Sequence, residues 1–215
     1  MIKEKMIELK KIIINQSATV EKMISKAIKG LIERNEEILK EVIERDEFEV
    51  NNNELIIDEK CVSILALYHP EAKDLRTIMM ISKMSIDLER IGDSAVNIAQ
   101  SSLYLIDKPP VKPYIDLPKM AEEAMKMLSD SINSFVNESD LLAVDVCKRD
   151  AIVDGYRDQI IRELITHMFS DPGTIERGLQ LISISNNLER IADLSTNIAE
   201  ESVYVAKGKV IKHRR

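Results

Sequence analysis

One segment of this chain occurs twice, 100 residues apart. Residues 88–99 read LERIGDSAVNIA, and residues 188–199 read LERIADLSTNIA. At that offset, 11 of the 24 residues in positions 81–104 are identical to their counterparts. Such a repeat predicts two copies of one supersecondary unit. The set that repeats best is polar, Glu-x-x-x-Asp-x-x-x-Asn, and this indicates a site as well as a fold.

The composition predicts long helices packed in one or two domains. Of the 215 residues, 45% are hydrophobic and 31% are charged, whereas only 4% are aromatic. Glu, Lys, Leu and Met are abundant, and all four favour helices. The net charge of −7 argues against nucleic-acid binding, which needs a basic surface to neutralise phosphates. An anionic chain suits cations or basic partners better.

Cysteine usage and hydropathy indicate the compartment. Cys61 and Cys147 lie far apart in apolar helical patterns, so we expect buried, unreactive thiols rather than a disulfide framework or a zinc site. Residues 1–5 alternate charged and apolar side chains and do not resemble a signal peptide. No run approaches the roughly 18 apolar residues of a membrane span. The sequence predicts a cytosolic protein that is peripheral to a membrane at most.

Prolines and apolar spacing predict the helix boundaries. All six prolines fall where a helix should begin or end, and four of them lie within residues 109–118. In the first half, apolar residues three and four apart predict helices over residues 2–31, 46–68 and 71–106, with a short one from residue 36. In the second half they predict helices over residues 117–136, 150–169 and 172–206, with a short one over 141–146.

This helix order predicts an all-α fold of two tandem, internally repeated three-helix bundles, because short connections favour antiparallel neighbours. We expect the first bundle over residues 1–108 and the second over residues 119–215. The Pro-rich segment 109–118 is the expected joint.

Acidic and amide side chains form stripes on four of these helices. Positions four apart share a helix face, so the stripes lie opposite the apolar positions. Each helix contributes one pair: Glu47 and Asn51, Glu89 and Asp93, Asp150 and Asp154, Glu189 and Asp193. Further candidates on or beside the stripes are Asn97, Asn197, Glu54, Asp58, Asp158 and Glu200.

A charged stripe is ordinarily a solvated helix face. Like charges four apart are slightly unfavourable, however, and here they recur on equivalent helices. Carboxylate and amide oxygens suit hard cations. We therefore predict metal sites at the eight paired residues, with a divalent or ferric ion such as iron, manganese, magnesium or zinc.

Other polar residues carry weaker signals. Arg90 and Arg190 either orient a carboxylate, hold an anion or form structural salt bridges. Only His69, His167 and His213 occur, and none has the Glu-x-x-His spacing of ferritin-like bundles. We interpret Glu163 with His167 as a helix-end polar pair rather than a chelate. No nucleophilic triad, P-loop or Gly-rich nucleotide turn is present, so we expect no enzymatic activity.

In these motifs the chain resembles the PhoU family, accessory regulators of phosphate-specific transport. The resemblance is strongest in residues 50–51, 57–59, 70–76, 88–93, 150–154 and 188–198. It implies two similar three-helix bundles whose Glu/Asp-x-x-x-Asp motifs bind metal ions, in some members multinuclear iron clusters. It also implies a cytosolic, often homodimeric protein that restrains the phosphate ABC transporter and the phosphate-sensing histidine kinase.

Carried over to this chain, the metal motifs fall on the same eight residues. Asn51 is neutral where Asp154 is acidic, so the first site is expected to hold its metal more weakly or with a different nuclearity. Two other classes remain open: a metal-independent helical adaptor, and a carboxylate-bridged metalloenzyme with an open coordination position.

Overall fold

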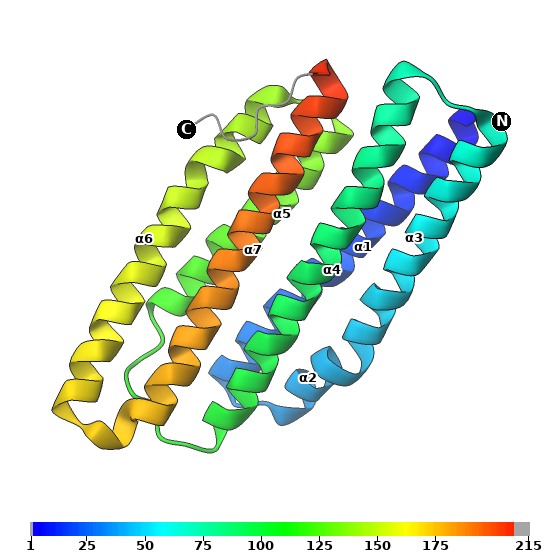
Figure 1. The fold of residues 1–215 in the computed structure, drawn as a ribbon. Helices are drawn as coiled ribbons and strands as arrows, with labels where there is room; N and C mark the ends of the chain where they lie inside the picture. Colours follow the sequence, from blue (N-terminus) through cyan, green and yellow to red (C-terminus); the bar gives the residue numbers. More distant parts are fainter. Residues whose placement is uncertain (1, 209–215) are drawn as a thin grey trace.

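All regular structure in the computed structural model, which describes residues 2–208, is helical (Figure 1). The first half contains α1 (Ile2–Glu33), α2 (Glu36–Glu41), the π-helical turn η1 (Val42–Asp46), α3 (Glu47–Tyr68) and α4 (Ala72–Ile106). The second half contains α5 (Asp116–Val136), α6 (Asp140–Ser170), the 3-10 turn η2 (Pro172–Thr174) and α7 (Ile175–Lys207). The all-α prediction with repeated three-helix bundles is confirmed.

Four of the long helices lie side by side in the order α3, α4, α7, α6, and α1 and α5 pack against one face of this layer (Figure 1). Helices α1, α3 and α4 form one bundle, and α5, α6 and α7 form the other. The bundles contact each other mainly through α4 and α7, and also through α1 and α5. Ile86, Arg90 and Asn97 of α4 are exposed.

The boundaries of α6 and α5 are among those that differ from the prediction. Helix α6 runs unbroken from residue 140 to 170, where a separate short helix over 141–146 was expected. Ser139 caps its start by accepting a hydrogen bond from the Leu142 amide at 3.3 Å, and neither Pro nor Gly interrupts residues 141–154. Helix α5 begins at Asp116, inside the expected joint. Pro118 therefore lies in its first turn, where a missing N–H loses no helical hydrogen bond.

The two thiols lie within the helical packing. Cys61 is buried between α3 and α4, with Sγ 3.8 Å from the carbonyl oxygen of Ile78. Burial raises its pKa to about 12. Cys147 is half-buried, and burial, with the charges of Glu200 and Asp150, raises its pKa to about 11. Both thiols are free, and the expectation of buried thiols is met fully by Cys61 and in part by Cys147.

Within residues 2–208, no helix combines the length and the hydropathy that a bilayer span requires. His213 lies outside the described residues.

Candidate metal centres

The first-half cluster consists of Glu47, Asn51 and Glu54 on α3 with Glu89 and Asp93 on α4. The two helices approach closely because Gly92 stands between the α4 acids. A Cβ at that position would lie 3.2 Å from Cγ1 of Val50. Asn51 is exposed, whereas the other four side chains are half-buried.

Electrostatic repulsion is concentrated at Glu89. Its pKa is raised, first because burial disfavours the charged form and then because Asp93 and Glu54 carry like charges nearby. Arg90 and Arg190 oppose this shift. The helix pair thus holds several carboxylates within electrostatic reach of one another.

The second-half cluster is built from α6 and α7 in the corresponding way. Asp150 and Asp154 face Glu189 and Asp193 across the helix pair. The pKa of Glu189 is raised by burial and then by Asp193, while Arg157 acts in the opposite direction. The pKa of Asp193 is also raised, by partial desolvation and by Asp154.

The helix packing therefore brings the predicted pairs onto adjacent helices in each half. It does not bring them into a preformed centre. Among residues 2–208, no three Asp, Glu, His or Cys side chains converge closely enough to hold a metal ion as they stand. Assignment of a metal to these eight residues stays a prediction.

Arg157 is the cluster residue that sequence reasoning missed. Its guanidinium lies among the second-half carboxylates and binds Glu189 through Nη1. The same nitrogen is 3.2 Å from Oδ1 of Asp154. The signal in the sequence was a basic residue three positions after Asp154, where the first half has Glu54.

Three of the six additional candidates have other partners. Asn97 donates to Asn187 at 3.3 Å across the contact between the bundles. Asp58 accepts from Ser82 Oγ at 3.3 Å, and Asp158 accepts from Arg157. Asn197 lines a shallow cavity of about 300 Å³ between α4 and α7.

Two of the additional candidate residues remain, Glu54 and Glu200. Glu54 lies near Glu89, so it belongs with the first-half cluster. Glu200 is half-buried, and its charge raises the pKa of Cys147.

The arginines of the repeated motif do different things. Arg90 lies with Nη1 3.7 Å from Oδ1 of Asp87, which fits a structural salt bridge. Arg190 acts electrostatically on Glu89 of the other bundle. The equivalent arginines therefore differ in role: Arg90 pairs within α4, and Arg190 acts across the contact between the bundles.

Glu163 is bound by Lys112 of the joint and accepts a hydrogen bond from Gln159 at 3.0 Å. These contacts, with the charge of His167, lower its pKa. The predicted pair of Glu163 with His167 therefore reduces to an electrostatic influence, while Lys112 and Gln159 are the direct partners of Glu163.

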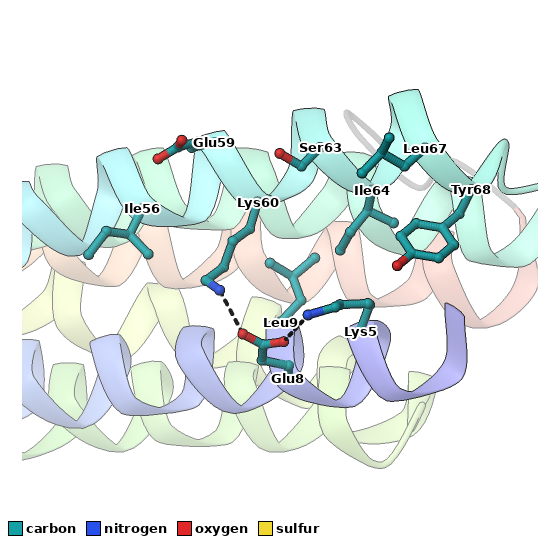
Figure 2. A pocket seen from close by; sticks show the side chains of 10 residues that line it. All are labelled: Lys5, Glu8, Leu9, Ile56, Glu59, Lys60, Ser63, Ile64, Leu67 and Tyr68. Atoms are coloured by element: carbon teal, nitrogen blue, oxygen red, sulfur yellow. Dashed lines mark hydrogen bonds and ion pairs between the residues drawn. The ribbon is translucent and has the colours of Figure 1, made fainter. Parts of the chain in front are cut away.

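A cavity of about 370 Å³ lies between α1 and α3 (Figure 2). Glu8 lies on its wall, 2.6 Å from Nζ of Lys60 and 3.0 Å from Nζ of Lys5. Hydrogen bonds from these two lysines lower the pKa of Glu8 to about 2. None of the eight predicted metal residues lines this cavity.

Two homologous three-helix bundles with paired acidic stripes define a class of internally duplicated helical proteins. A family model described as the PhoU domain matches this chain twice, at residues 13–102 and 117–202. The chain belongs to the PhoU family. The two matched segments correspond to the two bundles.

Relatives and solved structures cover almost the whole chain. The phosphate-specific transport system accessory protein PhoU homolog of Aquifex aeolicus is 39% identical over 207 residues, which is 96% of this chain and 93% of that protein. The crystal structure of PhoU from Pseudomonas aeruginosa matches with a TM-score of 0.93 at 33% identity, covering 97% of this chain and 100% of that one. The phosphate transport system regulatory protein PhoU from Streptococcus pneumoniae matches with a TM-score of 0.90 at 27% identity, covering 98% and 99%.

Proposed function

We propose that this protein is an accessory regulator of phosphate transport that restrains uptake when phosphate is plentiful. The observation that carries the proposal is the match of both bundles to the PhoU family, together with relatives named for the phosphate-specific transport system. Its partners would be the cytosolic subunits of the phosphate ABC transporter and the phosphate-sensing histidine kinase. It would act in the cytoplasm, as a homodimer, beside the membrane.

The proposed mode of action is binding, not catalysis. The sequence carries no nucleophilic triad or nucleotide-binding loop, and the acidic stripes follow long helices that offer extended faces for docking. An anionic chain of this kind suits a basic partner surface.

We further propose that metal ions bind at the paired residues. Glu47, Asn51, Glu89 and Asp93 would hold them in the first half. Asp150, Asp154, Glu189 and Asp193 are the matching set in the second half, open to an ion only when Arg157 leaves Glu189 and Asp154. A bound ion would supply positive charge that offsets the repulsion among these carboxylates. Because each set spans two helices, the side chains would then fix α3 against α4, or α6 against α7, and stabilise the docking-competent state.

The alternative of a metal-independent helical adaptor is favoured by one observation. The carboxylates of residues 2–208 do not converge in threes at metal-binding separation. An adaptor would dock through the same helix faces without any ion.

Genetic complementation tests the regulatory role. Deleting the gene in its host should derepress phosphate uptake under phosphate-replete conditions, and the wild-type gene should restore repression. The same phosphate uptake after deletion as before it would refute the regulatory role.

A double variant separates the metal-dependent regulator from the adaptor. Glu89→Gln/Glu189→Gln should fold, as judged by circular dichroism, but fail to restore repression. Glu59→Gln/Glu122→Gln removes the same charge from two exposed positions outside the clusters and should complement fully. Full complementation by Glu89→Gln/Glu189→Gln would favour the adaptor.

A further inference from the structure

The guanidinium of Arg157 already acts as a cation within the second-half cluster. Nη1 binds Glu189 on α7 and lies 3.2 Å from Asp154 on its own helix. On its other side, Nε and Nη2 donate to Oδ1 of Asp158 at 3.2 and 3.1 Å. One permanently charged group therefore contacts three carboxylates and joins α6 to α7.

The first half has the opposite charge at this position. Asn51 and Asp154 are equivalent, so the counterpart of Arg157 is Glu54. Glu54 adds a carboxylate beside Glu89 instead of neutralising it.

The first-half carboxylates also lack a direct counter-ion. Within residues 2–208, none of the ion pairs involves Glu47, Glu54, Glu89 or Asp93. Arg90 and Arg190 influence Glu89 only through longer-range electrostatics.

These two environments present different obstacles to a metal ion. In the second half, an ion would have to displace the guanidinium from Asp154 and Glu189, or approach it against like-charge repulsion. Arginine stays protonated, so it cannot leave by losing its charge. In the first half, none of the ion pairs within residues 2–208 places a guanidinium on Glu47, Glu54, Glu89 or Asp93, so an incoming cation meets no such competition. The second-half residues, with Arg157 in place, do not fit a metal ion.

We propose that Arg157 is the resident cation of the second-half cluster and closes it to metal ions, so that metal uptake by this chain is confined to the first-half cluster. This inference rests on the proposed metal-binding role. It reverses the order of metal affinity expected from Asn51 alone, which predicted the weaker site in the first half. In the first half, Glu54 supplies a carboxylate that Asn51 does not. In the second half, Arg157 binds the additional carboxylate, that of Asp154.

Manganese titration of the purified full chain, followed by electron paramagnetic resonance, tests the assignment without reference to activity. The manganese load of the wild type should be lost in Glu89→Gln/Asp93→Asn and unchanged in Glu189→Gln/Asp193→Asn. Arg157→Gln should raise the load to about twice that of the wild type, because the guanidinium no longer competes. The added load should disappear in Arg157→Gln/Glu189→Gln/Asp193→Asn.

The reciprocal substitution keeps the proposal testable if Arg157→Gln fails to fold. Glu54→Arg should weaken manganese binding in the first half by at least about tenfold, because it places a like charge beside the ion. Two controls change charge equally on the same helices at exposed positions outside the clusters: Arg162→Gln on α6 and Glu59→Arg on α3. Neither control should alter the load.

The outcomes separate two kinds of failure. A wild-type load that vanishes with Glu189→Gln/Asp193→Asn overturns the role of Arg157 and leaves metal binding intact, as does an unchanged load in Arg157→Gln. An unchanged affinity in Glu54→Arg also overturns it. No manganese in either the wild type or Arg157→Gln rejects metal binding itself, and the inference with it.

Discussion

Cys61 shows how packing sets the chemistry of a single residue. Only 2% of its surface is exposed, and its Sγ lies 3.8 Å from the carbonyl oxygen of Ile78. A thiolate in this apolar setting loses its hydration, so burial, helped by the charge of Asp58, raises the pKa to about 12. The thiolate is the nucleophilic form, and a raised pKa therefore suppresses reactivity near neutral pH.

We predict slow modification of the native thiols at pH 8 by a thiol-specific reagent such as DTNB. In Cys147→Ala, Cys61 should react at least about a hundredfold more slowly in the native protein than in denaturing urea. Stopped-flow absorbance gives both rates. The linked stability is complete below the pKa of the unfolded thiol and falls as pH rises above it, since only the unfolded state then ionises. Equal rates in the two states would contradict this account.

Two glycines within helices should respond to alanine in opposite directions. A Cβ on Gly30 of α1 would lie 2.5 Å from Cδ2 of buried Leu39, so Gly30→Ala should destabilise by about 1–3 kcal/mol through overpacking. Gly155 on α6 has nothing within 4 Å of its added Cβ, so Gly155→Ala should stabilise by about 0.5–1 kcal/mol through helix propensity. Urea unfolding measures both, and the same sign for both variants would refute the argument.

At the scale of helices, the two bundles share ion pairs whose signs are reversed. The two bundles can be aligned so that buried Ile28 of α1 corresponds to buried Ile132 of α5. In this alignment Lys26 is equivalent to Asp130, and Glu8 is equivalent to Lys112. Lys26 Nζ is 2.7 Å from Asp46, whereas Asp130 is 2.6 Å from Nη1 of Arg149. The repeat thus keeps the attraction between helices without keeping the sign of either partner.

The pair Glu8 with Lys60 follows the same rule (Figure 2). Its equivalent in the second bundle is Lys112 with Glu163. Three of the four pairs start on α1 or α5, and the fourth starts at Lys112, just before α5. Each pair reaches the next long helix or the turn before it, so these contacts hold corresponding helices in register.

Exchanging the charges of Lys26 and Asp46 tests whether the fold requires the ion pair itself rather than either residue alone. Lys26→Asp should destabilise by about 1–3 kcal/mol, because it faces Asp46 with a like charge in a partly buried place. Lys26→Asp/Asp46→Arg, which copies the second bundle, should recover most of that loss. A double-mutant cycle by urea unfolding gives the coupling energy. Additive losses would indicate that the pair contributes nothing.

At the scale of the whole molecule, α4 and α7 run antiparallel across the junction of the bundles. Ser101 Oγ lies 3.4 Å from Ser183 Oγ, and Tyr104 donates to Glu176 at 2.6 Å. The connection between α4 and α5 is tied to both bundles: Arg34 donates to the carbonyl of Lys108, and Arg177 donates to that of Pro109. The two bundles therefore hold together by packing as well as by covalent connection.

We predict that cutting the joint leaves the bundles associated. A protease site inserted between Pro110 and Val111 should be cleavable, because Pro110 is exposed and lies outside the helices. The fragments should then co-elute on gel filtration at the position of the uncut protein, since the contacts of α4 with α7 and of α1 with α5 survive the cut. Separate elution of two fragments would show that the covalent joint is what holds the bundles together.

The sequence by itself determined the helical content, the duplication and the helix faces. These properties depend on local periodicity: apolar residues three and four apart predict the buried side of each helix, and prolines mark most ends. For the same reason the eight paired residues could be placed on faces opposite the apolar stripes. The unbroken helix α6 was missed because Ser139 and the packing of Ala143 and Val146, both fully buried, favour continuation.

Only the tertiary structure decided which helix faces meet and which charges pair. Nothing in the spacing of residues near position 157 specifies that this guanidinium reaches Glu189, because that contact depends on how α6 packs against α7. The link from Arg190 to Glu89 likewise depends on the antiparallel pairing of α4 with α7. A local pattern sets the direction of a side chain around its own helix, whereas its partner is set by the distance and angle between helices.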